Sequence, residues 1–306
     1  MRIVSLLPSA TEILYAIGAG DQVVGVTHEC DFPIETRGKP HLTSSSLPQV
    51  ARSADIDRHV RAHLHVGSSI YALDGALLER LEPDLIVTQE LCPVCAVSYE
   101  IVSAATKRLK GDPRIVSLEP SSLEDVYDNI LAVGELVSHS ERAKKFVDGL
   151  RLRERNLRAL VAGRSTPRAL VLEWTDPPMS GGHWTPEIVE LAGGVPVLGN
   201  PRKDSQRLEW SAIALADPDF IIVAPCGFDL TTTERETRAL EGNQIWRELR
   251  AVNSGALALV DGNAYLNRPG PRLLDTAEIF AVALHPEVAD QLPRYPDGWK
   301  IADRKM

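Results

Sequence analysis

The chain has 306 residues, with 33 Lys or Arg against 42 Asp or Glu, which gives a formal net charge of −9. An acidic chain without a long basic stretch lacks the clustered cations that a nucleic-acid-binding surface needs. A hydrophobic content of 44% with only four cysteines excludes collagen, a disordered chain and a small disulfide scaffold, and the length favours two domains.

Short β-branched runs alternate with helical segments in the first 120 residues. The predicted strands are 3–7, 23–27, 84–89 and 114–118, and the predicted helices are 10–17 and 96–109. Apolar strands separated by helices are typical of a parallel sheet that is covered on both faces. The segment 40–73 lies outside this alternation and carries a short predicted helix at 55–64. A stretch of this length without a regular pattern usually serves a function or is poorly ordered.

The alternation begins again after two long helices. The helices are predicted at 123–138 and 140–162, followed by strands at 168–174, 195–198, 220–224 and 256–260, with helices at 186–192, 211–216, 232–251 and 271–284. Glu82-Pro83-Asp84 is echoed by Asp217-Pro218-Asp219, each before an apolar strand. We therefore predict an α/β fold of two similar lobes with mostly parallel sheets, joined by one long backbone helix, with a ligand cleft between the lobes. The predicted boundaries are 1–121, 122–165 and 166–306.

In open parallel sheets, ligands bind beyond the carboxyl ends of the strands. All four cysteines lie in segments that follow predicted strands, together with several polar and aromatic residues, and Trp174 is the last residue of one of those strands. These residues are His28, Glu29 and Cys30, then Glu90, Cys92 and Cys95, then Trp174, His183 and Trp184, and finally Cys226 and Asp229.

Three readings of the cysteines stay open. A Cys-x-x-Cys pair at Cys92 and Cys95, completed by Cys30 and Cys226, suits zinc or an iron–sulfur cluster. Four separate buried thiols are the second reading, and a disulfide or a redox pair is the third. No phosphate-binding loop, nucleophile elbow or His-Glu-x-x-His occurs, so we expect no enzyme. The first residues do not match a secretory signal, and we expect a cytoplasmic location, or a periplasmic or surface-tethered one if a native leader is missing.

Several stretches resemble the substrate-binding proteins of ABC importers that have a helical backbone, nearest to their cobalamin-binding members. The similarity extends over nearly the whole chain. The stretches that carry it are Leu7-Pro8-Ser9-Ala10-Thr11-Glu12-Ile13, Asp31-Phe32-Pro33, Ser180-Gly181-Gly182, Glu190-Leu191-Ala192-Gly193-Gly194 and Arg268-Pro269-Gly270-Pro271-Arg272.

The resemblance implies a corrinoid, haem or iron–siderophore ligand and an ABC permease that docks on Glu79. The cysteines and the segment 40–73 are not features of the cobalamin-transport member, and the second docking position falls at Ser211. We therefore expect a binding protein for a metal-containing ligand, with an importer receptor or a thiol redox enzyme using Cys92 and Cys95 as alternatives. The candidate ligand-binding residues are His28, Glu29, Ser44, Tyr71, Glu90, Trp174, His183, Trp184, Asp229 and Arg268.

Overall fold

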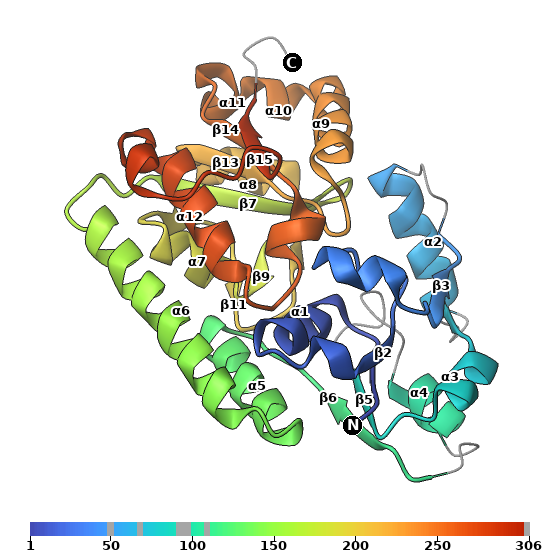
Figure 1. Cartoon of the computed structure of the whole chain (residues 1–306). Coiled ribbons are helices and arrows are strands. Elements are labelled where there is room, and N and C mark those ends of the chain that lie inside the picture. The colour runs from blue at the N-terminus through green and yellow to red at the C-terminus, as the bar shows by residue number, and fades with distance from the viewer. Residues whose placement is uncertain (48–51, 66–69, 90–98, 107–110, 303–306) are drawn as a thin grey trace. The chain divides into compact units, whose positions relative to one another are not determined.

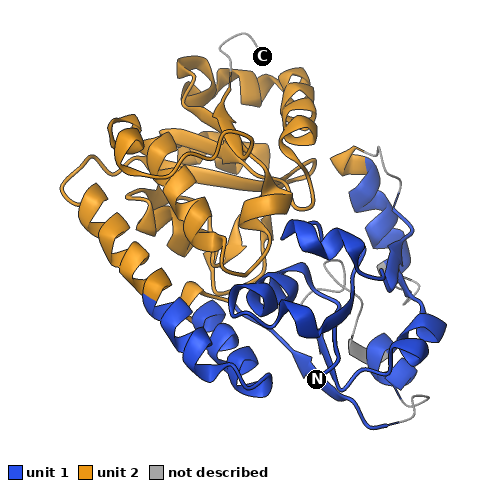
Figure 2. Cartoon of the chain, in the orientation of Figure 1, with its two compact units in different colours: residues 1–51, 55–120, 125–148 blue, residues 52–54, 121–124, 149–306 orange. Residues whose placement is uncertain are grey.

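The computed structural model describes residues 1–47, 52–65, 70–89, 99–106 and 111–302. The chain forms two compact units, which Figure 2 shows in two colours. The first unit comprises Met1–Ala51, Asp55–Pro120 and Asp125–Asp148. The second unit comprises Arg52–Ala54, Ser121–Glu124 and Gly149–Met306. No helix in the described part of the chain is both long and apolar enough to cross a membrane.

The first unit is built on a four-stranded sheet of order β2-β1-β5-β6, in which every pairing is parallel. The strands are β1 (Ile3–Ser5), β2 (Val23–Val26), β5 (Leu85–Thr88) and β6 (Arg114–Ser117), and the helices are α1 (Pro8–Ala16), α3 (Gly75–Leu81) and α4 (Tyr99–Thr106). Val4, Ile86, Leu78 and Val102 pack in one buried cluster of this unit. The predicted strands are therefore confirmed, with small changes at their ends.

The segment 40–73 has regular structure where it is described. β3 (Thr43–Ser45) and β4 (Tyr71–Leu73) pair antiparallel, and α2 (Ser53–His65) lies between them in the chain. Leu42, Ile70 and Tyr71 join the core cluster of the first unit. The predicted short helix is confirmed, and the pair of short strands is a feature that the sequence pattern did not reveal.

The second unit has a mixed central sheet of order β12-β8-β7-β13-β14-β15, with β10 beside β7. The strands are β7 (Arg168–Thr175), β8 (Pro178–Ser180), β10 (Val195–Pro196), β12 (Gln206–Arg207), β13 (Phe220–Val223), β14 (Leu257–Val260) and β15 (Trp299–Ile301), and β9 (Gly182–His183) pairs with β11 (Asn200–Pro201) apart from them. The helices are α7 (Thr185–Leu191), α8 (Trp210–Ala216), α9 (Leu230–Ala239), α10 (Gln244–Glu248), α11 (Arg250–Ser254) and α12 (Leu273–Leu284). β7, β13 and β14 run parallel, while β8, β12 and β15 pair antiparallel at the two sides. The α/β class is thus observed in each unit. The sheet is parallel throughout in the first unit, whereas three of the six strand pairings of the second sheet are antiparallel, so the prediction of mostly parallel sheets holds for the first unit only.

The prediction of one helix over 232–251 is wrong. The chain instead forms α9, a 3₁₀ turn at Leu240–Gly242, and the short helices α10 and α11. Asn243 is extended and its side chain accepts a hydrogen bond from the backbone N–H of Trp246, so that a new helix begins at this point. The break places Trp246 in the core of the second unit, where it is fully buried.

Residues 122–165, predicted as a helical connection, form α5 (Leu123–Leu136) and α6 (Ser140–Val161). The boundary between the units falls within α6, after Asp148. In the first unit, His139 Nδ1 lies 2.9 Å from the carbonyl oxygen of Ile17 at the end of α1. In the second unit, Arg153 contacts α12 through Asp275 and Glu278.

The repeated Pro-Asp sequence forms the same turn in both units. Glu82 ends α3 and Asp217 ends α8, both in the left-handed region with φ of 39° and 40°. Asp84 then accepts a hydrogen bond from the backbone N–H of Arg2, before β1, and Asp219 accepts one from that of Arg168, the first residue of β7. The two units therefore share local structure as well as sequence at this point.

We predict that Arg153→Met lowers the free energy of unfolding by about 2 to 3 kcal/mol. Glu278 is only 4% exposed and would lose its cationic partner, while the 37% exposure of the Arg153 side chain moderates the loss. The hydrogen bond from Tyr295 Oη to Glu278, at 2.6 Å, would remain. Denaturant unfolding measures the change.

The matched control is Arg158→Met on the same helix. Arg158 pairs with Glu154 four residues away at the surface, and we expect a loss below about 0.5 kcal/mol. Equal losses for the two variants would contradict the role assigned to Arg153.

Candidate functional site: two groups at the strand ends

The parallel strands of the first unit end at one edge of the sheet, and a polar group lies there. Thr27 follows β2 and donates its backbone N–H to Ser5 O, which extends the strand pairing by one residue. Its hydroxyl lies 2.7 Å from that of Thr43 on β3. His28 therefore leaves the sheet at a position that neighbouring strands determine.

His28 is half-buried and held by Thr43. Its backbone N–H donates to Thr43 Oγ1 at 3.0 Å, and its ring Nδ1 lies 2.6 Å from the same oxygen. Burial, with a smaller effect of His41, lowers the pKa of His28, so the imidazole is neutral at pH 7. With its proton on Nδ1, the ring donates to Thr43 and keeps a lone pair on Nε2, as metal-binding imidazoles do.

Tyr71, from β4, and Glu29 belong to the same group. The Tyr71 ring lies 5.7 Å from the His28 ring, and its hydroxyl donates to Glu29 Oε1 at 3.1 Å. Ser44, also on β3, is exposed. The structure thus brings together three of the predicted residues, namely His28, Glu29 and Tyr71, around Thr43, which the sequence reasoning missed.

Cys30 is buried at 2% exposure, and its Sγ lies 3.1 Å from Thr11 Oγ1. Its backbone N–H donates to Thr27 O, and its carbonyl accepts from Thr36 Oγ1. Cys226, in the second unit, is exposed. Glu90, Cys92 and Cys95 lie outside the described residues, so a four-cysteine site stays a prediction. Within the described ranges, no group of three or more His, Cys, Asp or Glu is placed to hold a metal.

Aromatic side chains gather at the corresponding strand ends of the second unit. Trp174 lies near the end of β7, and its ring centroid is 5.1 Å from that of Phe228, in the segment after β13. The Trp174 Nε1 atom is buried and has no hydrogen-bond partner among the described residues. Phe228 is 7% exposed, and its carbonyl accepts from the backbone N–H of Asn263. The indole therefore has both an aromatic neighbour and an unused donor.

Arg268 and Asp229, both predicted ligand-binding residues, have structural contacts. Arg268 is 5% exposed, and its guanidinium donates to Asn263 Oδ1 at 3.1 Å. Asp229 is the N-cap of α9, because its carboxylate accepts from the backbone N–H of Thr232 at 2.7 Å. The role of Asp229 that the structure displays is therefore to begin a helix.

Glu173, which precedes Trp174 on β7, is the centre of a hydrogen-bond network. It accepts hydrogen bonds from Thr185 Oγ1, from Ser205 Oγ at 2.5 Å and from the backbone N–H of Gly182. A Cβ atom at Gly182 would lie within 2.7 Å of the backbone of 203–205, so only glycine fits here. Burial raises the pKa of Glu173, although these hydrogen bonds oppose the effect.

His183 and Trp184 lie beside that network. His183 has a φ of 46°, its Nε2 lies 3.2 Å from Asp204 Oδ1, and its ring stacks on Trp184 at 5.5 Å. Trp184 Nε1 donates to the carbonyl of Leu266 at 2.9 Å. The sequence reasoning missed Glu173 and Phe228. An acidic residue inside an otherwise apolar strand was the signal that could have revealed Glu173.

A comparison with protein families identifies the chain. The model of the periplasmic binding protein family matches residues 3–264. The chain belongs to this family. Its members bind substrates, and the protein is accordingly a ligand-binding receptor. Two curated relatives are a vitamin B12-binding protein of Vibrio cholerae, 25% identical over 90% of this chain and 86% of the relative, and an uncharacterized ABC transporter substrate-binding lipoprotein of Bacillus subtilis, 25% identical over 94% and 80%.

Solved structures of this family share the fold. The periplasmic vitamin B12-binding protein of Vibrio cholerae gives a TM-score of 0.66 at 23% identity, over 95% of this chain and 98% of that chain. A periplasmic haem-binding protein in complex with two haems gives 0.70 at 17% identity, over 94% and 99%. The predicted family and the predicted α/β fold are therefore confirmed.

We predict that the free energy of unfolding of Glu173→Gln increases, relative to that of wild type, as the pH rises from 4 to 8. The folded-state pKa of Glu173 is raised above its unfolded value, so its contribution to stability is present at low pH and is lost as the pH rises. For each pH unit between the folded-state and unfolded-state pKa values, the contribution of Glu173 to the free energy of unfolding changes by about 1.4 kcal/mol. Denaturant unfolding at several pH values measures the trend.

Glu234→Gln provides a comparison of opposite sign. The hydrogen bond from Lys300 lowers the pKa of Glu234, so this carboxylate adds stability as the pH rises. The stability of its variant relative to wild type should fall as the pH rises through the acidic range up to the ordinary carboxyl pKa and stay constant above it, so this comparison includes measurements below pH 4. Parallel pH trends for the two variants would show that burial of Glu173 does not govern its titration.

Proposed function

We propose that this receptor binds a metal-containing tetrapyrrole, with a corrinoid as the preferred ligand. The observation that carries the proposal is the neutral, Thr43-oriented imidazole of His28 beside the Tyr71 ring. An imidazole nitrogen is a good ligand for cobalt or iron, and a flat aromatic ring suits the face of a macrocycle. The vitamin B12-binding and haem-binding names of several relatives support this choice.

In the second unit, we propose Trp174 as the surface that contacts the macrocycle. Its ring is half-buried against Phe228, which fixes its orientation, and its buried Nε1 can donate a hydrogen bond to a ligand acceptor. A preoriented aromatic side chain loses little conformational entropy when a ligand binds. Arg268, held by Asn263, would place a positive charge near an acidic substituent of the ligand.

We propose an ABC permease as the macromolecular partner. The ABC transporter name of the Bacillus subtilis relative supports this, and Glu79 on α3 is exposed as a docking residue must be. Ser211, at the predicted second docking position, is also exposed, and Glu209 precedes it as the N-cap residue of α8. The cytoplasmic location stays a prediction, as does the redox chemistry of Cys92 and Cys95.

We predict that the purified protein binds aquocobalamin and that His28→Ala abolishes the accompanying change in its absorption spectrum. The change is expected because an imidazole nitrogen replaces the cobalt-bound water. His59→Ala is the matched control, because His59 is an imidazole on α2 of the same unit, outside the group around Thr43. Trp174→Ala should weaken binding by about tenfold through loss of aromatic contact. Equilibrium dialysis with absorption spectroscopy measures both effects.

Haemin, titrated in parallel, distinguishes a corrinoid receptor from a haem receptor. Tight haemin binding with no aquocobalamin binding would replace the corrinoid by haem within the same proposal. If neither tetrapyrrole binds, and anaerobically purified protein contains iron or zinc that is lost in Cys226→Ser, the tetrapyrrole proposal is wrong and the cysteine-ligated centre takes its place.

A further inference from the structure

The turn that follows β14 is a short π-helix, Gly262–Leu266, which we call the π-turn. The backbone N–H of Asn267 closes it by donating to the carbonyl of Gly262 at 3.0 Å. Asp261 caps its start, because the Asp261 carboxylate accepts from the backbone N–H of Ala264 at 2.6 Å. Single π-helical turns are rare and frequently lie at functional sites. Because β7, β13 and β14 are parallel, the π-turn lies at the sheet edge where the segments after β7 and β13 also begin.

The π-turn packs on the segment that follows β13. A Cβ atom at Gly262 would lie 2.3 Å from the backbone carbonyl oxygen of Pro225, so only glycine allows this approach. The backbone N–H of Asn263 donates to the carbonyl of Phe228 at 3.1 Å. The π-turn therefore holds the backbone that carries Phe228, and the Phe228 ring is the neighbour of Trp174.

The same turn holds two further residues of the candidate site. The last carbonyl groups of a helix have no partner within the helix, and that of Leu266 accepts from Trp184 Nε1 at 2.9 Å. Asn263 Oδ1 accepts from the guanidinium of Arg268 at 3.1 Å. Trp184 precedes α7, whereas Phe228 follows β13, so the π-turn connects site residues from distant parts of the chain.

Asn267 links the π-turn to the end of β13. Its side-chain Nδ2 donates to the carbonyl of Ala224 at 3.3 Å and to that of Gly262 at 3.0 Å. Ala224 is fully buried, and its own N–H extends the pairing of β13 with β7 by donating to Leu172 O. Two carbonyl oxygens require a donor between them, so a carboxylate of the same shape cannot replace this amide without repulsion.

We propose that Asn267 is a positioning residue of the ligand site in the second unit. By linking the π-turn to β13, it sets the position of Trp184 and of Phe228, and through Phe228 the orientation of Trp174. The inference rests on the proposed function, since Trp174 is the surface assigned there to the macrocycle. It goes beyond that function, because Asn267 acts through the π-turn and not as a ligand contact.

Asn253 provides a matched control in the same unit. Its Nδ2 also donates to two backbone carbonyls, those of Arg247 and Leu249, at 2.9 and 3.1 Å. These bonds join α11 to the end of α10, and not the π-turn to β13. Asn267→Asp and Asn253→Asp therefore remove the same kind of contact at different places.

Equilibrium dialysis with aquocobalamin and with haemin compares the variants. We expect Asn267→Asp to weaken binding of the tetrapyrrole that the wild type binds by about tenfold, because a site that is less firmly held loses affinity. Asn267→Leu, which removes the donor without adding a charge, should have the same effect, whereas Asn253→Asp should leave the affinity unchanged. Thermal unfolding checks that each variant folds. Wild-type affinity in both Asn267 variants would overturn the inference.

The indole N–H resonances give a readout that needs no ligand. The chain has five tryptophans, whose resonances can be assigned through Trp→Phe variants. Those of Trp174 and Trp184 should shift in Asn267→Asp and stay in place in Asn253→Asp, while that of Trp246, in the core, should stay in place in Asn267→Asp. If the wild type bound neither tetrapyrrole, the proposed function would fail, and this measurement would still decide the role of Asn267. Unchanged Trp174 and Trp184 resonances would contradict it.

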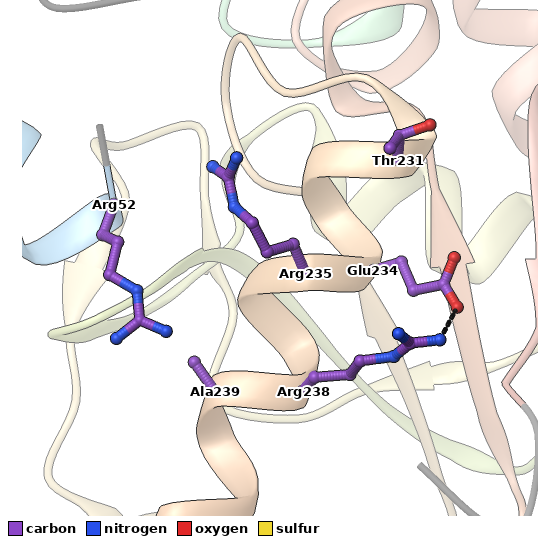
Figure 3. Close-up of a pocket in the computed structure, with 6 residues that line it drawn as sticks. All are labelled: Arg52, Thr231, Glu234, Arg235, Arg238 and Ala239. Carbon is purple, nitrogen blue, oxygen red and sulfur yellow. Dashed lines mark hydrogen bonds and ion pairs between the residues drawn. The ribbon is translucent and has the colours of Figure 1, made fainter. Parts of the chain in front are cut away.

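A cavity elsewhere in the second unit supplies a control for where the ligand binds. It measures about 400 Å³ and lies against α9, where Thr231 lines it together with Glu234 and Arg238, which pair with each other (Figure 3). Thr231→Val should leave tetrapyrrole binding at the wild-type level. Loss of binding in Thr231→Val, with wild-type binding in Asn267→Asp, would place the ligand at α9 and overturn the inference.

Discussion

Parallel strand pairing is the constraint on which the candidate sites depend. In each unit it brings the carboxyl ends of neighbouring strands to one edge, and the ladder continues one residue further, through Thr27 N–H to Ser5 O and Ala224 N–H to Leu172 O. The side chains that follow are therefore anchored by backbone hydrogen bonds on rigid elements. His28 leaves the first sheet in this way, and Phe228 follows the second one.

The parallel strands were predictable because their signal is local. Runs of β-branched and apolar residues between helical segments define β1, β2 and β5, and likewise β7, β13 and β14, with few errors beyond their ends. The helical segment after Asp229 was less predictable. Its periodicity continues through residue 251, and the break at Asn243 depends on how Trp246 packs in the core. Periodicity does not contain that tertiary contact.

The candidate sites were predictable in position and less so in chemistry. The rule on strand ends located His28, Glu29 and Trp174, but the partners that give them properties come from distant parts of the chain. Thr43 is 15 residues from His28, and Ser205 is 32 residues from Glu173. Hydrogen bonds over such separations leave no periodic signal in a single sequence. For the same reason, the burial of Cys30 beside Thr11 was not visible from its place after a strand.

The turn shared by the two units has a consequence for engineering. Glu82 and Asp217 occupy left-handed backbone conformations that glycine adopts without strain, at a cost of about 1 kcal/mol for other residues. The side chain of Glu82 is exposed, while Asp217 also pairs with Arg250 at 3.2 Å. Glycine at 82 would relieve backbone strain alone, and glycine at 217 would relieve it while removing an ion pair. Comparing the two glycine substitutions within this one chain therefore allows the energetic cost of the left-handed backbone conformation to be measured apart from the contribution of the surface ion pair.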